Sequence, residues 1–178
     1  MATLRTFTLG TAIALAMTLS ACGSKSEKEV ASGTYTDPET GKTADYKVTS
    51  DTSGEHGTIS IKTEDGEMQF GGGAGNAKFP AGFSPYPGAK VTGGFTATNK
   101  DGAGGMASFE VKGQAADVIA HFRKQAEAAG MKITTEVKAG ETAMFGAERP
   151  GDSKSGVQVT ATQAGDMVNG SITYGHGG

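Results

Sequence analysis

The sequence predicts an α+β fold, with a mainly antiparallel sheet covered by one helix and preceded by an N-terminal β-hairpin unit. Short runs of alternating apolar and polar residues dominate the chain and indicate strands. Only residues 114–129 repeat apolar side chains at helical spacing, with Gly130 where a helix-ending glycine belongs. Hairpin-length connections carrying glycine join most of the runs, which favours antiparallel pairing.

The N-terminal unit is expected to span residues 33–75. Residues 58–63 and 67–70 alternate strictly and are joined by Asp65-Gly66, a strong hairpin signal. The alternation predicts one shared, buried face. Its members are Ile59, Ile61, Met68 and Phe70. The glycine-rich run 71–75 is interpreted as a linker, because the segment after it lacks the residues of a phosphate-binding loop.

The second unit is expected to span residues 76–178 with the element order β-β-α-β-β-β-β. Its predicted strands cover residues 90–98, 105–111, 131–137, 142–148, 157–162 and 168–174. The inner face of this sheet is expected to be mainly aliphatic. It comprises Val157, Val159, Ala161, Val168, Ile172 and Tyr174.

The N-terminus has the features of a secretory leader. Arg5 precedes an apolar stretch, residues 9–19, that is too short to span a bilayer. The run Leu19-Ser20-Ala21-Cys22 resembles the bacterial lipobox, in which the cysteine is lipidated and becomes the first mature residue. The resemblance implies a signal peptide over residues 1–21, diacylglycerol on the Cys22 thiol and a lipid-anchored envelope protein. The alternative is an ordinary cleaved signal followed by a chance cysteine.

Residues 22–32 are expected to form a lipidated flexible tether, because they are polar and lack periodicity. Gly23 follows the cysteine, and by analogy with sorting in enteric bacteria this favours the outer membrane, facing the periplasm.

The leader contains one of the 16 basic residues and none of the 19 acidic residues, so the mature net charge would be −4. This mixed, slightly acidic balance argues against nucleic-acid binding.

The segment before residue 90 carries a second resemblance. Residues 79–91 contain three prolines and the run Tyr86-Pro87-Gly88-Ala89, and Gly130-Met131-Lys132 follows the predicted helix. This pattern is similar to small bacterial envelope domains, mostly uncharacterised, that open with a Tyr-Pro-Gly-Ala motif. The resemblance covers residues 78–175 and implies no catalytic residues.

No catalytic, cofactor or metal site is expected. The sole cysteine is assigned to the anchor, and the histidines at 56, 121 and 176 are scattered rather than spaced as metal ligands. Asp117 and His121 are interpreted as a surface pair one helical turn apart. Residues 151–156 bring serines near a lysine but match no nucleophile motif, and indicate a hairpin loop.

These observations favour a non-enzymatic lipoprotein that presents a binding or structural domain. The membrane, through lipid on Cys22, and an envelope protein or glycan are the expected partners. An alternative is a small-ligand or glycan binder whose surface includes Phe83, Tyr86 and Phe145. An enzyme acting on envelope polymers is less favoured.

Overall fold

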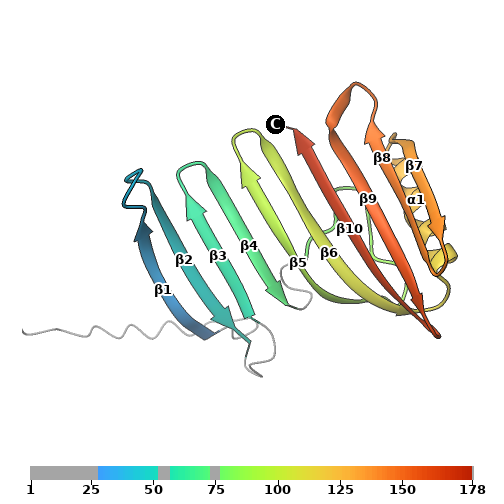
Figure 1. Ribbon diagram of the computed structural model, residues 1–178, viewed down its shortest axis with the longest axis horizontal. Helices are drawn as coiled ribbons and strands as arrows, with labels where there is room; N and C mark the ends of the chain where they lie inside the picture. The colour runs from blue at the N-terminus through green and yellow to red at the C-terminus, as the bar shows by residue number, and fades with distance from the viewer. Residues whose placement is uncertain (1–27, 52–56, 73–76, 178) are drawn as a thin grey trace, which may run out of the picture.

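One wide antiparallel sheet organises the computed structural model, which describes residues 28–51, 57–72 and 77–177. Its strand order is β1-β2-β3-β4-β5-β6-β10-β9-β8-β7, with one helix, α1, at the β7 end (Figure 1). The elements are β1 (Lys28–Thr36), β2 (Thr43–Ser50), β3 (Gly57–Thr63), β4 (Gly66–Gly72), β5 (Lys90–Asn99), β6 (Gly102–Lys112), α1 (Ala115–Ala128), β7 (Lys132–Ala139), β8 (Thr142–Arg149), β9 (Asp152–Ala164) and β10 (Met167–Gly177). The chain therefore builds the sheet outward to β6, crosses through α1 to the far edge, and returns strand by strand to β6.

The predicted α+β class is wrong: the fold is β-rich. The described residues form ten strands and one helix in the order β-β-β-β-β-β-α-β-β-β-β. The order predicted for residues 76–178 is found from β5 onward, but four further strands of the same sheet precede it. All strands belong to one sheet, because β4 pairs with β5 along seven residue pairs, from Gly66–Asn99 to Gly72–Gly93. The four N-terminal strands thus extend the sheet rather than precede it.

The ends of the expected tether and linker also belong to strands. β1 begins at Lys28, so residues 28–32 run along β2, paired except at Val30, where the register shifts. At the end of β4, Gly71 pairs with both β3 and β5, and Gly72 pairs with β5. Residues 1–27, with Cys22 and the leader, and residues 73–76 lie outside the described part of the chain.

The hairpin between β3 and β4 is confirmed, but its turn lies one residue earlier than the predicted Asp65-Gly66. Thr63 pairs with Gly66, which leaves Glu64 and Asp65 as the two turn residues. A Cβ built on Gly66 would overlap the carbonyl oxygen of Thr98 in β5, so this position requires glycine for close approach of two backbones.

The predicted helix is confirmed as Ala115–Ala128, with its apolar stripe buried. Gly130 adopts φ +76°, and the Met131 amide donates to the carbonyl of Ala126 at 2.9 Å, which ends the helix as expected for a C′ glycine. The other end is capped from the sheet. Gln163 in β9 accepts a hydrogen bond from the Ala115 amide through Oε1 at 2.8 Å and donates through Nε2 to the Gly113 carbonyl at 2.9 Å.

The hydrophobic core lies between α1 and strands β6, β10, β9 and β8. Phe122 of α1 is fully buried, with ring centroids 5.5 Å from Phe109 of β6 and 6.2 Å from Phe79. The predicted inner face of β9 and β10 is confirmed, because five of its six residues are buried and Tyr174 packs against them.

The apolar face of the sheet changes sides between β6 and β5. Ala107 in β6 is buried under the helix layer, whereas the preceding residue, Met106, projects to the opposite face. Phe95 in β5 pairs with Met106, and Phe70 in β4 pairs with Phe95, so both project away from the helix as well. The apolar side chains of β2–β4, with Phe95 and Ala97 of β5, therefore lie on the face that α1 does not cover.

Candidate functional site

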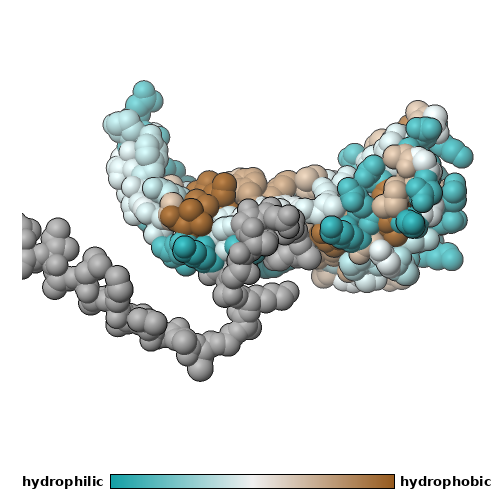
Figure 2. Space-filling model, turned by 90° about the horizontal axis from the view of Figure 1, so that it is seen from below, coloured by the Kyte–Doolittle hydropathy of each residue, from teal (hydrophilic) through white to brown (hydrophobic). Residues whose placement is uncertain are grey.

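The uncovered apolar face is the first candidate site. Two rows of side chains cross four adjacent strands in register. One row is Val48, Ile59, Phe70 and Phe95, and the other is Tyr46, Ile61, Met68 and Ala97. The rings of Phe70 and Phe95 stack with centroids 5.9 Å apart. In Figure 2 the molecule is a curved slab, and hydrophobic residues gather on its thin half over β2–β4.

This face was expected to be buried, and that expectation is wrong. Ile59 is 45% exposed, Met68 is 42% exposed and Tyr46 is 40% exposed. Alternation determines which side chains share a face, but it does not supply a layer to cover them. Contiguous apolar patches of a few hundred Å² on a soluble monomer are often functional.

The opposite face of the same strands is polar. In β2, β3 and β4 it carries Lys47, Ser60 and Glu67 among other polar side chains. Lys47 Nζ lies 3.0 Å from Glu29 Oε2, and the Ser60 hydroxyl donates to Glu67 Oε1 at 3.2 Å. The thin half of the sheet is therefore amphipathic, with the helix-side face suited to water.

A pocket of about 590 Å³ is the second candidate site. It lies on the helix side of the sheet, where the covering layer ends. Its walls include Phe79 and Met131, and strands β5, β6, β9 and β10 form its floor. Polar and charged groups also face it. They are Lys78, Thr96, Thr98, Arg149, Asp152, Ser155, Tyr174 and His176.

A local turn holds Asp152, the acidic residue of this pocket, in position. The Ser155 hydroxyl, which is buried, donates to Asp152 Oδ2, and the Lys154 amide donates to Oδ1 at 3.0 Å. The Ser155 hydrogen bond is the main reason that the pKa of Asp152 lies below its ordinary value of 3.8. A carboxylate with a lowered pKa is a weak general base, so this pair is poorly suited to activate the serine as a nucleophile. The expected hairpin loop at 151–156 is observed only in part, because β9 begins at Asp152.

Tyr174 supplies an amphipathic wall of the pocket. Partial burial raises its pKa above the ordinary value of 10.0, so its hydroxyl is protonated at neutral pH. The ring lies over Gly105, where a Cβ would approach the tyrosine Oη to 2.8 Å. The absence of a side chain at Gly105 therefore leaves room for the Tyr174 ring to lie against the sheet.

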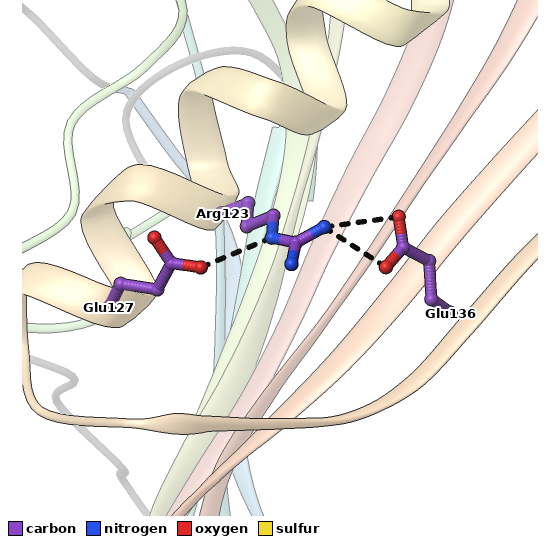
Figure 3. A network of polar contacts seen from close by, with 3 residues as sticks. All are labelled: Arg123, Glu127 and Glu136. Atoms are coloured by element: carbon purple, nitrogen blue, oxygen red, sulfur yellow. Dashed lines mark hydrogen bonds and ion pairs between the residues drawn. The ribbon is translucent and has the colours of Figure 1, made fainter.

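A groove of about 450 Å³ lies between α1 and strands β7 and β8. Arg123 spans one side of it: Nε donates to Glu127 Oε1 at 3.1 Å, and Nη1 lies 3.0 Å from Glu136 Oε2 (Figure 3). All three side chains are partly exposed, so this network contributes modestly to stability. Its geometry fits a clamp that holds the helix to β7.

The three aromatic residues expected to form a binding surface lie in or against the core. Phe145 is fully buried and Phe83 is 9% exposed. Tyr86 is partly buried, and its ring meets His121 edge-on at a centroid distance of 5.2 Å. This arrangement counts against ligand binding by these three side chains.

Gln125 holds the proline-rich segment against the helix. Its Oε1 accepts from the Ser84 amide at 2.6 Å, and its Nε2 donates to the Ser84 carbonyl at 3.2 Å. Nε2 also lies 2.7 Å from His121 Nε2, so His121 has Gln125 and Tyr86 as close neighbours. No structural contact supports the expected pairing of His121 with Asp117 within the described residues.

The described residues contain no group of three or more His, Cys, Asp and Glu side chains placed to hold a metal ion. They also contain no helix with the length and apolar character needed to cross a membrane.

Comparison with known proteins adds no relative. No family model, curated protein or solved structure matches the chain.

Sequence reasoning missed the pocket and the uncovered face as sites. The pocket draws on residues from Lys78 to Gly177, and no local motif joins positions so far apart. The uncovered face was visible as alternation in 58–70, but the sequence contains no sign that a covering element is missing.

Proposed function

We propose that this chain is a non-enzymatic, lipid-anchored protein of the cell envelope that presents a β-rich binding domain in the periplasm, most simply from the outer membrane. The observation that carries the binding role is the uncovered apolar face of β2–β5. An antiparallel sheet ordinarily solvates one face and packs the other. Here the apolar face of the thin half has no covering layer within the described residues, so a partner is the natural cover.

The location rests on the lipobox-like run that ends at Cys22. Lipid at this position supports firm anchoring, because each buried CH₂ contributes about 0.8 kcal/mol and stable attachment takes at least two acyl chains. The structure begins six residues later, at Lys28, and the intervening residues are polar. A domain attached in this way stays close to the membrane surface.

The test of the anchor is Cys22→Ser in the full chain. The variant is expected to accumulate as unprocessed precursor and to lose metabolic labelling with fatty acid. Ser20→Ala keeps the residue types of the run small and serves as the matched control, with labelling retained. Normal processing and labelling of the Cys22→Ser variant would contradict the anchor.

A second candidate function is binding of a small ligand or glycan in the 590 Å³ pocket. Its volume lies within the range of small-molecule sites, and Arg149, Tyr174 and His176 offer polar groups beside apolar walls. The test is calorimetric titration with N-acetylglucosamine oligomers. Arg149→Ala should weaken any binding, whereas Lys124→Ala, outside the pocket, should not. Equal heats with both variants would remove this candidate.

A further inference from the structure

The size of the uncovered apolar face restricts what covers it. Four strands and two rows of side chains amount to roughly 300 Å² from ordinary strand spacings. Two copies packed face to face through these rows would bury roughly 600 Å², well below the 1,200 Å² typical of stable interfaces. The face alone is therefore too small to hold a second copy from dilute solution.

Attachment through Cys22 allows a surface of low affinity to bind the membrane. Cys22 lies six positions before Lys28, so a fully extended chain places the start of β1 within about 22 Å of the lipidated residue. A second contact made by an already tethered domain is intramolecular and needs little affinity of its own. The acyl chains of the leaflet that holds the anchor are an apolar phase always present within this reach.

The chemistry of the face matches lipid. From β2 to β4 every described residue on this face is uncharged, and the charged residues of these strands project to the other face. Tyr46, at the outer end of one row, has the amphipathic ring that favours the boundary between acyl chains and headgroups. Lys28 lies on the same face at the edge of the sheet, where it suits anionic headgroups.

We propose that the uncovered face of β2–β5 docks on the membrane leaflet that carries the Cys22 lipid, with the polar face of these strands toward the periplasm. This inference rests on the proposed function, because the anchor supplies the proximity. The docked domain would lie along the membrane and present the helix-side face, with its pocket, to the aqueous space.

Photolabelling from within the bilayer tests the docking. The full processed chain is reconstituted into phosphatidylethanolamine–phosphatidylglycerol vesicles that contain a phospholipid with a photoactivatable acyl chain, and labelled peptides are mapped by mass spectrometry. Label is expected on peptides of β2–β4 and absent from α1. Equal labelling of β3 and α1 peptides would overturn the proposal.

Two charge-matched variants of β3 sharpen the result. Ile59→Glu and Lys62→Gln each change the net charge by −1, but they alter opposite faces of one strand. Ile59→Glu is expected to reduce labelling of β3 about tenfold, because a carboxylate is costly to place among acyl chains. Lys62→Gln should leave labelling unchanged, and circular dichroism checks that both variants fold. Equal loss in both variants would contradict docking by this face.

Met68→Cys separates the membrane from a second copy. With Cys22 lipidated, this variant has one free thiol, on the exposed face. Rapid disulfide-linked dimers in vesicles, without label on β4, would show that another copy covers the face and would overturn the proposal. The mass of the N-terminal peptide reports the Cys22 lipid separately. If that lipid is absent, the anchor fails, and labelling with added vesicles still decides whether the face binds lipid.

Discussion

Phe109 in β6 lies directly across from Gly170 in β10, with its ring over the glycine on the helix side of the sheet. A Cβ built on Gly170 would overlap this ring. Phe109 is also fixed from the other side, because it packs against Phe122 of α1. The absence of a side chain at one position thus creates the space for a central aromatic residue of the core.

Gly170→Ala is therefore expected to destabilise the fold. Overfilling a packed core costs about 1–3 kcal/mol, because the ring or the strand must move. Gly175→Ala in the same strand is the control: a Cβ there would meet only the Lys154 carbonyl oxygen, at 3.5 Å. Urea unfolding of both variants measures the difference, and equal stability would contradict this account of Gly170.

Phe122→Ala is expected to remove the centre of the helix–sheet contact. Phe122 is fully buried and lies near the rings of Phe79 and Phe109, so its truncation should lower the free energy of unfolding by about 3–5 kcal/mol. Met68→Ala, on the uncovered face, should cost less than about 1 kcal/mol in solution. Similar losses for the two variants would mean that the uncovered face is buried in solution.

Gln125→Ala tests the attachment of the proline-rich segment. Loss of the amide group leaves the Ser84 N–H and C=O without their side-chain partner, at an expected cost of about 1–2 kcal/mol. Hydrogen exchange at the Ser84 amide should become faster. Lys124→Ala, at the adjacent exposed position, should leave that exchange rate unchanged. Unchanged exchange in Gln125→Ala would show that the segment is held by other contacts.

Asp152 predicts part of the acid sensitivity of the fold. Its pKa is lowered in the folded state, mainly by the Ser155 hydroxyl, so ionised Asp152 stabilises the folded protein above its unfolded pKa, near 3.8. This contribution is lost as the pH falls through the lower, folded-state pKa. Asp152→Asn should make the fall in the free energy of unfolding below about pH 4 less steep, and the contributions of the other acidic residues should remain. Denaturant unfolding at pH 3 and pH 7 measures the change, and an unaltered decline would contradict it.

Local patterns predicted the positions of most elements. The helical stripe of 114–129 and the alternation of 58–70 lie where the structure has α1 and the β3–β4 hairpin. These predictions succeeded because side-chain period and turn residues act over a few positions along the chain. The fold class failed because strand pairing between distant segments, such as β4 with β5, leaves no local signal.

The candidate sites depended still more on tertiary structure. Phe83 and Phe145 were interpreted as surface aromatics, but the segment held by Gln125 and the sheet under α1 bury them. Arg149 ends β8, whereas Tyr174 and His176 lie in β10, and the lateral pairing of β8, β9, β10 and β6 brings them to one pocket.

The sequence by itself determined which side chains share each face of the strands and where the helix lies, and its lipobox-like run is the basis for proposing lipid on Cys22. Tertiary structure decided which of those faces is covered. The physical reason is that alternation is a property of one strand, whereas burial needs a second layer. The helix lies over β6, β10, β9 and β8 on one side of the sheet, whereas the apolar side chains of β2–β4 project to the other side, so within the described residues no second layer covers them.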